Sequence, residues 1–96
     1  MTILIIDDEA GLRRSLAAHL EDMDFDVLDA ANGREGLAIL EADPGAVQAV
    51  VVDLNMPVMD GYSFIQAAVA VAPELPVVVL SGVGVVEDAL RAMRLG

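Results

Sequence analysis

The chain has 96 residues and a formal net charge of −11, from 16 acidic residues against five basic ones. This length allows a single domain, and the excess of acid argues against a nucleic-acid-binding surface, because phosphate contacts need clustered Lys and Arg. Hydrophobic residues make up 56% of the chain and aromatic residues only 3%, a mix that favours parallel strands covered on both faces. No apolar run approaches the roughly 20 residues that span a bilayer, and no signal peptide is evident, so we expect a cytoplasmic protein with no membrane partner.

In chain order, short apolar runs alternate with segments of helical period. The runs at 2–7, 26–30, 47–53 and 75–81 are mostly β-branched and bounded by charged or turn residues, so each predicts a strand. A helical stripe follows each run: Leu12, Leu16, Leu20 and Met23; Leu37 and Leu40; Ile65, Ala68, Val69 and Ala72; Val86, Ala89, Leu90 and Met93. The alternation predicts an α/β fold with a doubly wound parallel sheet, for which we expect the strand order 2-1-3-4.

Carboxylates end two of the expected strands. Asp7 and Asp8 follow the first run, and Asp53 ends the third. In the expected order these strands are neighbours, and ligands of open parallel sheets bind outside the carboxyl ends of such strands. Three converging carboxylates are unfavourable unless a cation lies among them, and oxygen ligands with room for water and a phosphoryl oxygen describe a Mg²⁺ site.

These acidic residues also have simpler structural explanations. An acid after a strand is often only a helix cap, and Asp8 with Glu9 in the first turn of a helix would be stabilising for that reason alone. Taken together at the ends of adjacent strands, however, the acids favour a site. A phosphate-binding loop is excluded by the acidic turn DDEAG, and the GVG at 82–84 lacks the third glycine of a dinucleotide fingerprint. His19 has no neighbouring Cys or His, so we expect it on a helix surface.

Three motifs then carry a resemblance to a known family. The segments ILIIDDE at 3–9, DLNMPVMDG at 53–61 and LSG at 80–82, in this order and spacing, resemble the receiver domain of bacterial two-component response regulators. The resemblance runs over the whole chain and implies one flavodoxin-like receiver domain over residues 1–96. It implies a signalling module and not an enzyme with a separate substrate.

The resemblance also implies roles for individual residues. Asp53 would be the phosphoacceptor, taking a phosphoryl group from the phosphohistidine of a sensor histidine kinase. Asp8 would bind Mg²⁺ directly and Asp7 chiefly through water, while the backbone carbonyl of Asn55 would be a further ligand beside Asp53. Ser81 would hydrogen-bond the phosphoryl group and couple it to loop movement. The conformational change would pass to an output domain in the same chain or to a separate protein.

The sequence departs from the family's pattern in one respect. Family members have a fifth strand and fifth helix, with a lysine at the tip of that strand that pairs with the phosphoryl group. This sequence contains no lysine and stops after the expected fourth helix, so we expect a receiver domain that is incomplete at its C-terminus. An uncovered fourth strand would favour association, and a homodimer is one expected outcome.

Two other functions remain open at this stage. A receiver-like interaction domain that is never phosphorylated would also fit a chain without the lysine. A phosphohydrolase of the haloacid dehalogenase type also uses an Asp at a strand tip with Mg²⁺. Such enzymes generally carry a second acid two residues after the nucleophile, where this chain has Asn55, so the sequence disfavours that reading.

Overall fold

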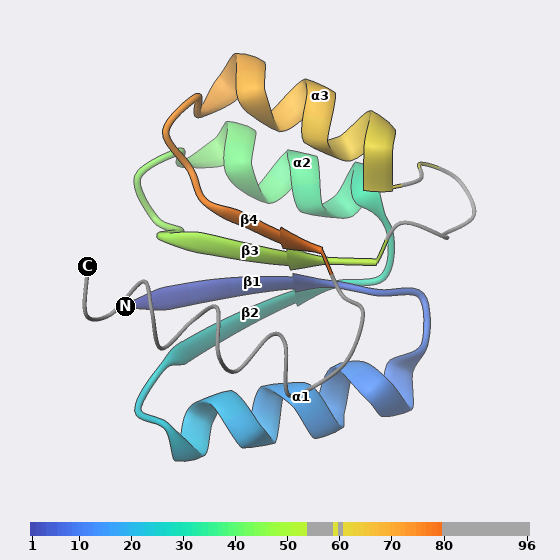
Figure 1. Ribbon diagram of the computed structural model, residues 1–96, viewed down its shortest axis with the longest axis vertical. Coiled ribbons are helices and arrows are strands. Elements are labelled where there is room, and N and C mark those ends of the chain that lie inside the picture. The colour runs from blue at the N-terminus through green and yellow to red at the C-terminus, as the bar shows by residue number, and fades with distance from the viewer. Residues whose placement is uncertain (54–58, 60, 80–96) are drawn as a thin grey trace.

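The computed structural model describes residues 1–53, 59 and 61–79. Its elements run in the order β1 (Thr2–Ile6), α1 (Ala10–Asp22), β2 (Asp26–Ala30), α2 (Gly33–Ala42), β3 (Ala49–Val52), α3 (Gly61–Val71) and β4 (Val77–Val79). The sheet forms the middle layer, with α1 on one face and α2 and α3 on the other (Figure 1). The expected fourth helix lies outside the described residues.

The sheet confirms the expected topology. All pairings are parallel and the strand order is β2-β1-β3-β4. Ile6, the last residue of β1, is paired with Ala30 of β2 and with Val52 of β3. The carboxyl ends of these three strands therefore lie side by side, at what we call the carboxyl edge of the sheet.

The core consists of two apolar clusters, one on each face of the sheet. On the α2 and α3 face, Leu4 and Ile6 of β1 pack with Leu40 and Phe64. On the α1 face, the alternate strand residues Ile3, Ile5, Ala49 and Val51 pack with Leu16 and Leu20 of α1 and with Phe25 of the turn that follows it. Because β1 and β3 are buried on both faces, they are apolar at every position except Thr2, the half-buried first residue of β1, in agreement with the composition.

Local hydrogen bonds explain where α2 begins. Asn32 is the N-cap residue, and its Oδ1 accepts a hydrogen bond from the Glu35 N–H at 2.9 Å. The Glu35 side chain in turn accepts from the Asn32 side-chain amide and from the Ala31 N–H. These reciprocal bonds satisfy donors that the first helical turn leaves free, and they fix the start of α2 at the carboxyl edge.

Some details of the sequence-based prediction were wrong. Strands β1, β3 and β4 are shorter than expected, because Asp7, Asp53 and residues 47–48 and 75–76 lie in the adjoining loops. Val69 was assigned to the buried stripe of α3 but is 55% exposed. Phe64 of the same helix, which the prediction omitted, is fully buried. The longest helix in the described ranges, α1, has 13 residues, and none of those helices is both long and apolar enough for a membrane span.

A close approach between α2 and β1 makes Gly36 sensitive to substitution. A Cβ atom at this position would overlap Cδ1 and Cγ1 of Ile6. Gly36 and Ile6 are both buried. We expect Gly36→Ala to lower the free energy of unfolding by about 1–2 kcal/mol, the net of overpacking and improved helix propensity. Urea denaturation measures the change. The control is Gly11→Ala, where nothing lies within 4 Å of the new Cβ; equal destabilisation by the two variants would contradict the prediction.

The turn between α1 and β2 contains a strained residue, Asp24, with φ of 69°. Its N–H donates to the Glu21 carbonyl and the Phe25 N–H donates to the Leu20 carbonyl, the pattern in which helices usually place glycine after their last turn. The negative side chain also lies at the negative end of the helix dipole. We expect Asp24→Gly to stabilise the protein by about 1 kcal/mol, and so to raise the Tm by about 4–8 °C.

Asp24→Asn separates the two causes of this effect, since it removes the charge and keeps a side chain. A thermal melt should place its Tm between those of the wild type and Asp24→Gly. A Tm for Asp24→Gly at or below the wild-type value would show that the turn is not strained in solution.

Candidate metal and phosphoacceptor site

The sheet itself positions two of the predicted site residues. Asp7 follows β1 and Asp53 follows β3, and each continues the hydrogen-bonding pattern of the strand before it. The Asp7 N–H donates to the Ala30 carbonyl of β2 at 3.2 Å, and the Asp53 N–H donates to the Ile6 carbonyl of β1 at 3.0 Å. Both carboxylates therefore extend from backbone that is held by the sheet, and not from free loops.

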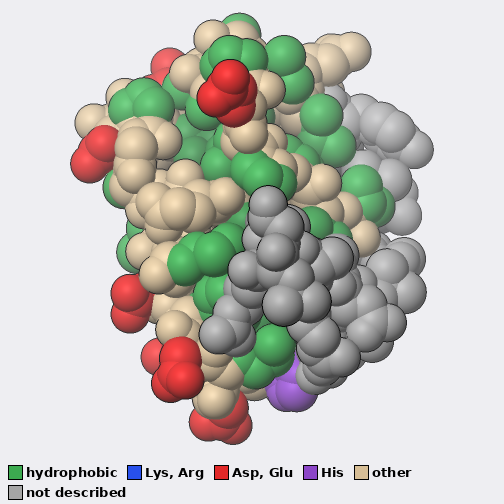
Figure 2. All heavy atoms as spheres, turned by 60° about the vertical axis from the view of Figure 1, so that its left-hand side comes forward, with side chains coloured by type: hydrophobic (Ala, Val, Ile, Leu, Met, Phe, Trp, Pro, Cys, Tyr) green, Lys and Arg blue, Asp and Glu red, His purple; other side chains and the backbone are tan. Residues whose placement is uncertain are grey.

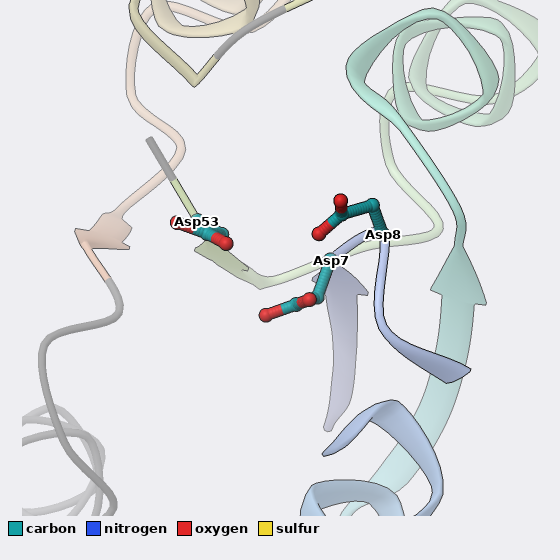
Figure 3. Close-up of side chains that lie close together, drawn as sticks. All are labelled: Asp7, Asp8 and Asp53. Carbon is teal, nitrogen blue, oxygen red and sulfur yellow. The ribbon is translucent and has the colours of Figure 1, made fainter. Parts of the chain in front are cut away.

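The structure brings together Asp7, Asp8 and Asp53, which we call the acid cluster. Each offers a carboxylate oxygen that lies within 4.8 Å of the other two, and within the described ranges no other group of three such residues does so. In Figure 3 the three side chains point toward a common space at the carboxyl edge. Asp7 is buried, Asp53 is half-buried and Asp8 is exposed, so the space opens to solvent on one side. The predicted convergence is confirmed.

The surroundings of Asp7 disfavour the ionised form of its side chain. Only 1% of the residue is exposed, and its Oδ2 atom is buried without a hydrogen-bond partner. Burial raises the pKa of Asp7, the charges of Asp53 and Asp8 raise it further, and the hydrogen bond that Oδ1 accepts from the Glu9 N–H at 2.8 Å opposes these effects. A cation beside Oδ2 would supply the missing partner.

The geometry and chemistry of the cluster suit Mg²⁺. Two oxygens bound to one Mg²⁺ ion lie at most about 4.2 Å apart, twice the ordinary Mg–O distance. The 4.8 Å limit of the acid cluster is therefore within a small side-chain movement of a ligand set. Three carboxylates and an opening to solvent also match the preference of Mg²⁺ for a few acidic ligands completed by water. The residues present fit the metal.

The helix-cap explanation of these acids was wrong. Glu9 is the N-cap residue of α1, its side chain makes no capping hydrogen bond, and the first turn of the helix contains no acidic residue. Asp8 precedes the cap. The carboxylate of Asp7 does accept from the Glu9 N–H, but this uses only one of its two oxygens.

The structure adds one residue that the sequence analysis did not identify. Arg13 of α1 donates from Nη1 to the main-chain carbonyl of Asp7 at 2.7 Å and from Nε to Oδ2 of Asp29 at 3.0 Å. The available signal was its spacing: Arg13 lies three residues before the buried Leu16, on the helix face directed at the sheet. An arginine on that face requires a polar partner.

Two other predicted site residues, Asn55 and Ser81, lie outside the described residues. His19 lies on α1 and is half-buried, with its Nε2 atom shielded from solvent, so the expected surface position holds for only part of the side chain.

The opposite edge of the sheet has a different character. An open hollow of about 500 Å³ lies there, between the loops that precede β3 and β4, with apolar and polar lining from Val47, Gln48, Pro73 and Leu75. Figure 2 shows this side of the molecule, with acidic side chains spread around apolar ones and no described Arg side chain in view. The hollow is separate from the acid cluster, and the described residues that line it include no Arg or Lys for phosphate contacts.

Comparisons with known proteins identify the family of the chain. The response regulator receiver domain family matches residues 3–96 of the chain. Over 94 residues the chain is 37% identical to a probable transcriptional regulator, ycf27, of Porphyridium aerugineum; the aligned region covers 98% of this chain and 38% of that protein. Over 98 residues it is 37% identical to a putative NtrX-like response regulator of Rickettsia conorii; the aligned region covers all of this chain and 20% of that protein.

Solved structures give the same result for the fold. The crystal structure of a response regulator receiver domain protein from Clostridium thermocellum superposes with a TM-score of 0.80 at 30% identity, covering 99% of this chain and 75% of that one. The chain thus spans about two fifths or less of the two relatives and most of this solved domain. With a family match over nearly its whole length, the chain belongs to the response regulator receiver domain family.

Proposed function

We propose that the chain is a phosphoacceptor module that takes a phosphoryl group onto Asp53 from a sensor histidine kinase in a Mg²⁺-dependent reaction. The observation that carries the proposal is the convergence of Asp7, Asp8 and Asp53 at the carboxyl edge. A single acid at a strand end has many uses. Three acids that converge from neighbouring strands, with one buried oxygen lacking a partner, favour the binding of a cation.

The transfer itself is a displacement at phosphorus. A carboxylate oxygen of Asp53 attacks the phosphorus of a phosphohistidine, the new O–P bond forms as the N–P bond breaks, and the imidazole leaves with the electron pair and is then protonated. Asp53 is only half-buried, so a donor can reach it. The hydrogen bond from its N–H to Ile6 keeps the main chain in place during the attack.

Asp7, Asp8 and Asp53 are the described residues that would hold Mg²⁺, and from the family resemblance the backbone carbonyl of Asn55 would be a further ligand. Bound there, Mg²⁺ would offset charge that builds on the transferring phosphoryl oxygens. We assign the phosphoryl hydrogen bond and the coupling to loop movement to Ser81, on the same resemblance. The conformational change would then pass to an output domain or to a separate protein. A second copy of the chain, in a homodimer, is one such partner.

The test uses acetyl phosphate as a donor, so that no cognate kinase is needed. Incubated with Mg²⁺, the protein should gain the mass of one phosphoryl group in an intact-mass measurement. The same incubation with EDTA in excess over metal should give no gain, because the carboxylates then repel the anionic donor. No gain with Mg²⁺, in a chain that circular dichroism shows to be folded, would overturn the proposal and favour a receiver that acts only through its surface.

A further inference from the structure

Arg13 links three elements at the acid cluster. It lies on α1, its Nη1 donates to the Asp7 carbonyl after β1, and its Nε forms an ion pair with Asp29 on β2. The Arg13 side chain is only 16% exposed, whereas that of Asp29 is 55% exposed. A partly buried guanidinium with two donors engaged at 2.7 and 3.0 Å is held in one orientation.

These contacts complete the restraint of Asp7. Its N–H donates to Ala30, its carbonyl accepts from Arg13, and its Oδ1 accepts from the Glu9 N–H. With the main chain held on both sides and one carboxylate oxygen engaged, the remaining oxygen, Oδ2, is left buried without a hydrogen-bond partner on a residue of the acid cluster. The bond from Arg13 is made to the main chain of Asp7, and the ion pair of Arg13 is made with Asp29, so Arg13 does not neutralise the acid cluster by a direct pair.

We propose that Arg13, anchored by Asp29, is a positioning residue for divalent-cation binding at the acid cluster. This inference rests on the metal site of the proposed function. Arg13 acts on the cation through Asp7: it fixes the peptide unit that carries the buried ligand. Groups that orient a metal ligand in this way typically contribute about 10–100-fold to metal affinity.

Charge and positioning predict changes of opposite sign. A guanidinium near a cation site repels the cation, so if charge were its main effect, removing Arg13 would tighten Mg²⁺ binding. If Arg13 positions Asp7, its removal weakens binding although a repelling charge has gone. The sign of the change therefore distinguishes the two roles.

The experiment is a calorimetric titration with Mg²⁺ alone, at a temperature at which circular dichroism shows each variant to be folded. Arg13→Gln should weaken binding about 10-fold or more. Arg13→Lys should weaken it almost as much, because one ammonium group keeps the charge but does not reproduce the two-donor fork. The matched control is Arg14→Gln, which removes the same charge from an exposed neighbour and should not weaken binding.

Asp29→Asn tests the anchor. It should weaken Mg²⁺ binding on its own, and the double variant with Arg13→Gln should bind no more weakly than Arg13→Gln alone, because both changes break one contact chain. If Arg13→Gln fails to fold, Arg13→Lys and Asp29→Asn carry the test.

The outcomes separate the two proposals. Wild-type protein that does not bind Mg²⁺ would overturn the metal site, and the role of Arg13 with it. Wild-type binding together with unchanged or tighter binding by Arg13→Gln and Arg13→Lys would overturn the role of Arg13 alone. Weaker binding by both, with Arg14→Gln unchanged, is the result expected of a positioning residue.

Discussion

Asp53→Asn should abolish the gain of a phosphoryl group from acetyl phosphate. The amide of asparagine has no anionic oxygen to attack phosphorus, although it has nearly the same shape as the carboxylate. The fold should survive, because the Asp53 N–H that donates to Ile6 is part of the main chain. Intact mass after incubation with Mg²⁺ and donor measures the result, and peptide mapping of the wild type should place the added mass on the peptide that contains Asp53.

The control makes the same chemical change at a strand residue of the opposite edge. Asp26 is the first residue of β2 and is exposed, so Asp26→Asn should be phosphorylated to the wild-type extent. Phosphorylation of Asp53→Asn at the wild-type level would mean that a different residue is the acceptor. Loss in both variants would point to a general effect of charge or stability.

Asp7→Asn should have two opposite effects, one on stability and one on metal binding. Without metal the variant should be more stable than the wild type at neutral pH, because it removes a buried charge from beside Asp8 and Asp53. Each kcal/mol so gained raises the Tm of a domain of this size by about 4–8 °C, so a thermal melt resolves the change. With Mg²⁺ the order should reverse, because the variant loses the ligand oxygen that is buried and has no partner.

The metal-dependent part of this prediction is read from the same melts. Mg²⁺ at about ten times its dissociation constant stabilises a folded protein by about 1.4 kcal/mol. If loss of the Asp7 ligand lowers the Mg²⁺ affinity about 100-fold, the stabilisation at the same Mg²⁺ concentration falls to about 0.1 kcal/mol. Wild-type Tm should therefore rise with Mg²⁺ while the Tm of Asp7→Asn stays nearly constant. A variant with a lower Tm than the wild type in EDTA and an undiminished response to Mg²⁺ would contradict both parts.

The stability difference should also depend on pH. The folded protein raises the pKa of Asp7 above its ordinary value of 3.8, so over the interval between the two values the folded state binds more protons than the unfolded state. The free energy of unfolding of the metal-free wild type should then fall, through this group, as pH rises across that interval. The advantage of Asp7→Asn should be absent below the interval, grow across it and stay constant above it; urea denaturation in EDTA at several pH values measures it.

The strands and the acid cluster could be predicted because each depends on a local pattern and one rule of topology. Runs such as 3–6 and 49–52 are apolar at every position, which marks strands buried on both faces. Once β1 and β3 are neighbours, the acids that follow them must meet, since parallel strands place their carboxyl ends at one edge. The convergence of Asp7, Asp8 and Asp53 needed no side-chain detail.

The errors arose where the local pattern was ambiguous or the contact was distant. Almost every residue from Phe64 to Ala72 is apolar, so periodicity does not define which side of α3 faces the sheet, and Val69 was assigned to the core in place of Phe64. Arg13 bonds to Asp29, 16 residues away on another strand, and no helical or strand period encodes such a contact. The role of an arginine that crosses between layers is visible only when the layers are assembled.

The continuation of the sheet into Asp7 and Asp53 has a consequence for amide hydrogen exchange. The two N–H groups at the site are bonded to Ala30 and to Ile6, in a parallel sheet whose central strands are fully buried over residues 3–6 and 49–52. They should therefore exchange with solvent only when the sheet opens, at rates close to those of the core amides. The side chain of Asp53 is partly exposed to solvent and that of Asp7 is buried, while the amides of both residues belong to the slowest-opening part of the molecule. The two carboxylates of the site are thus attached to backbone that opens only when the core opens.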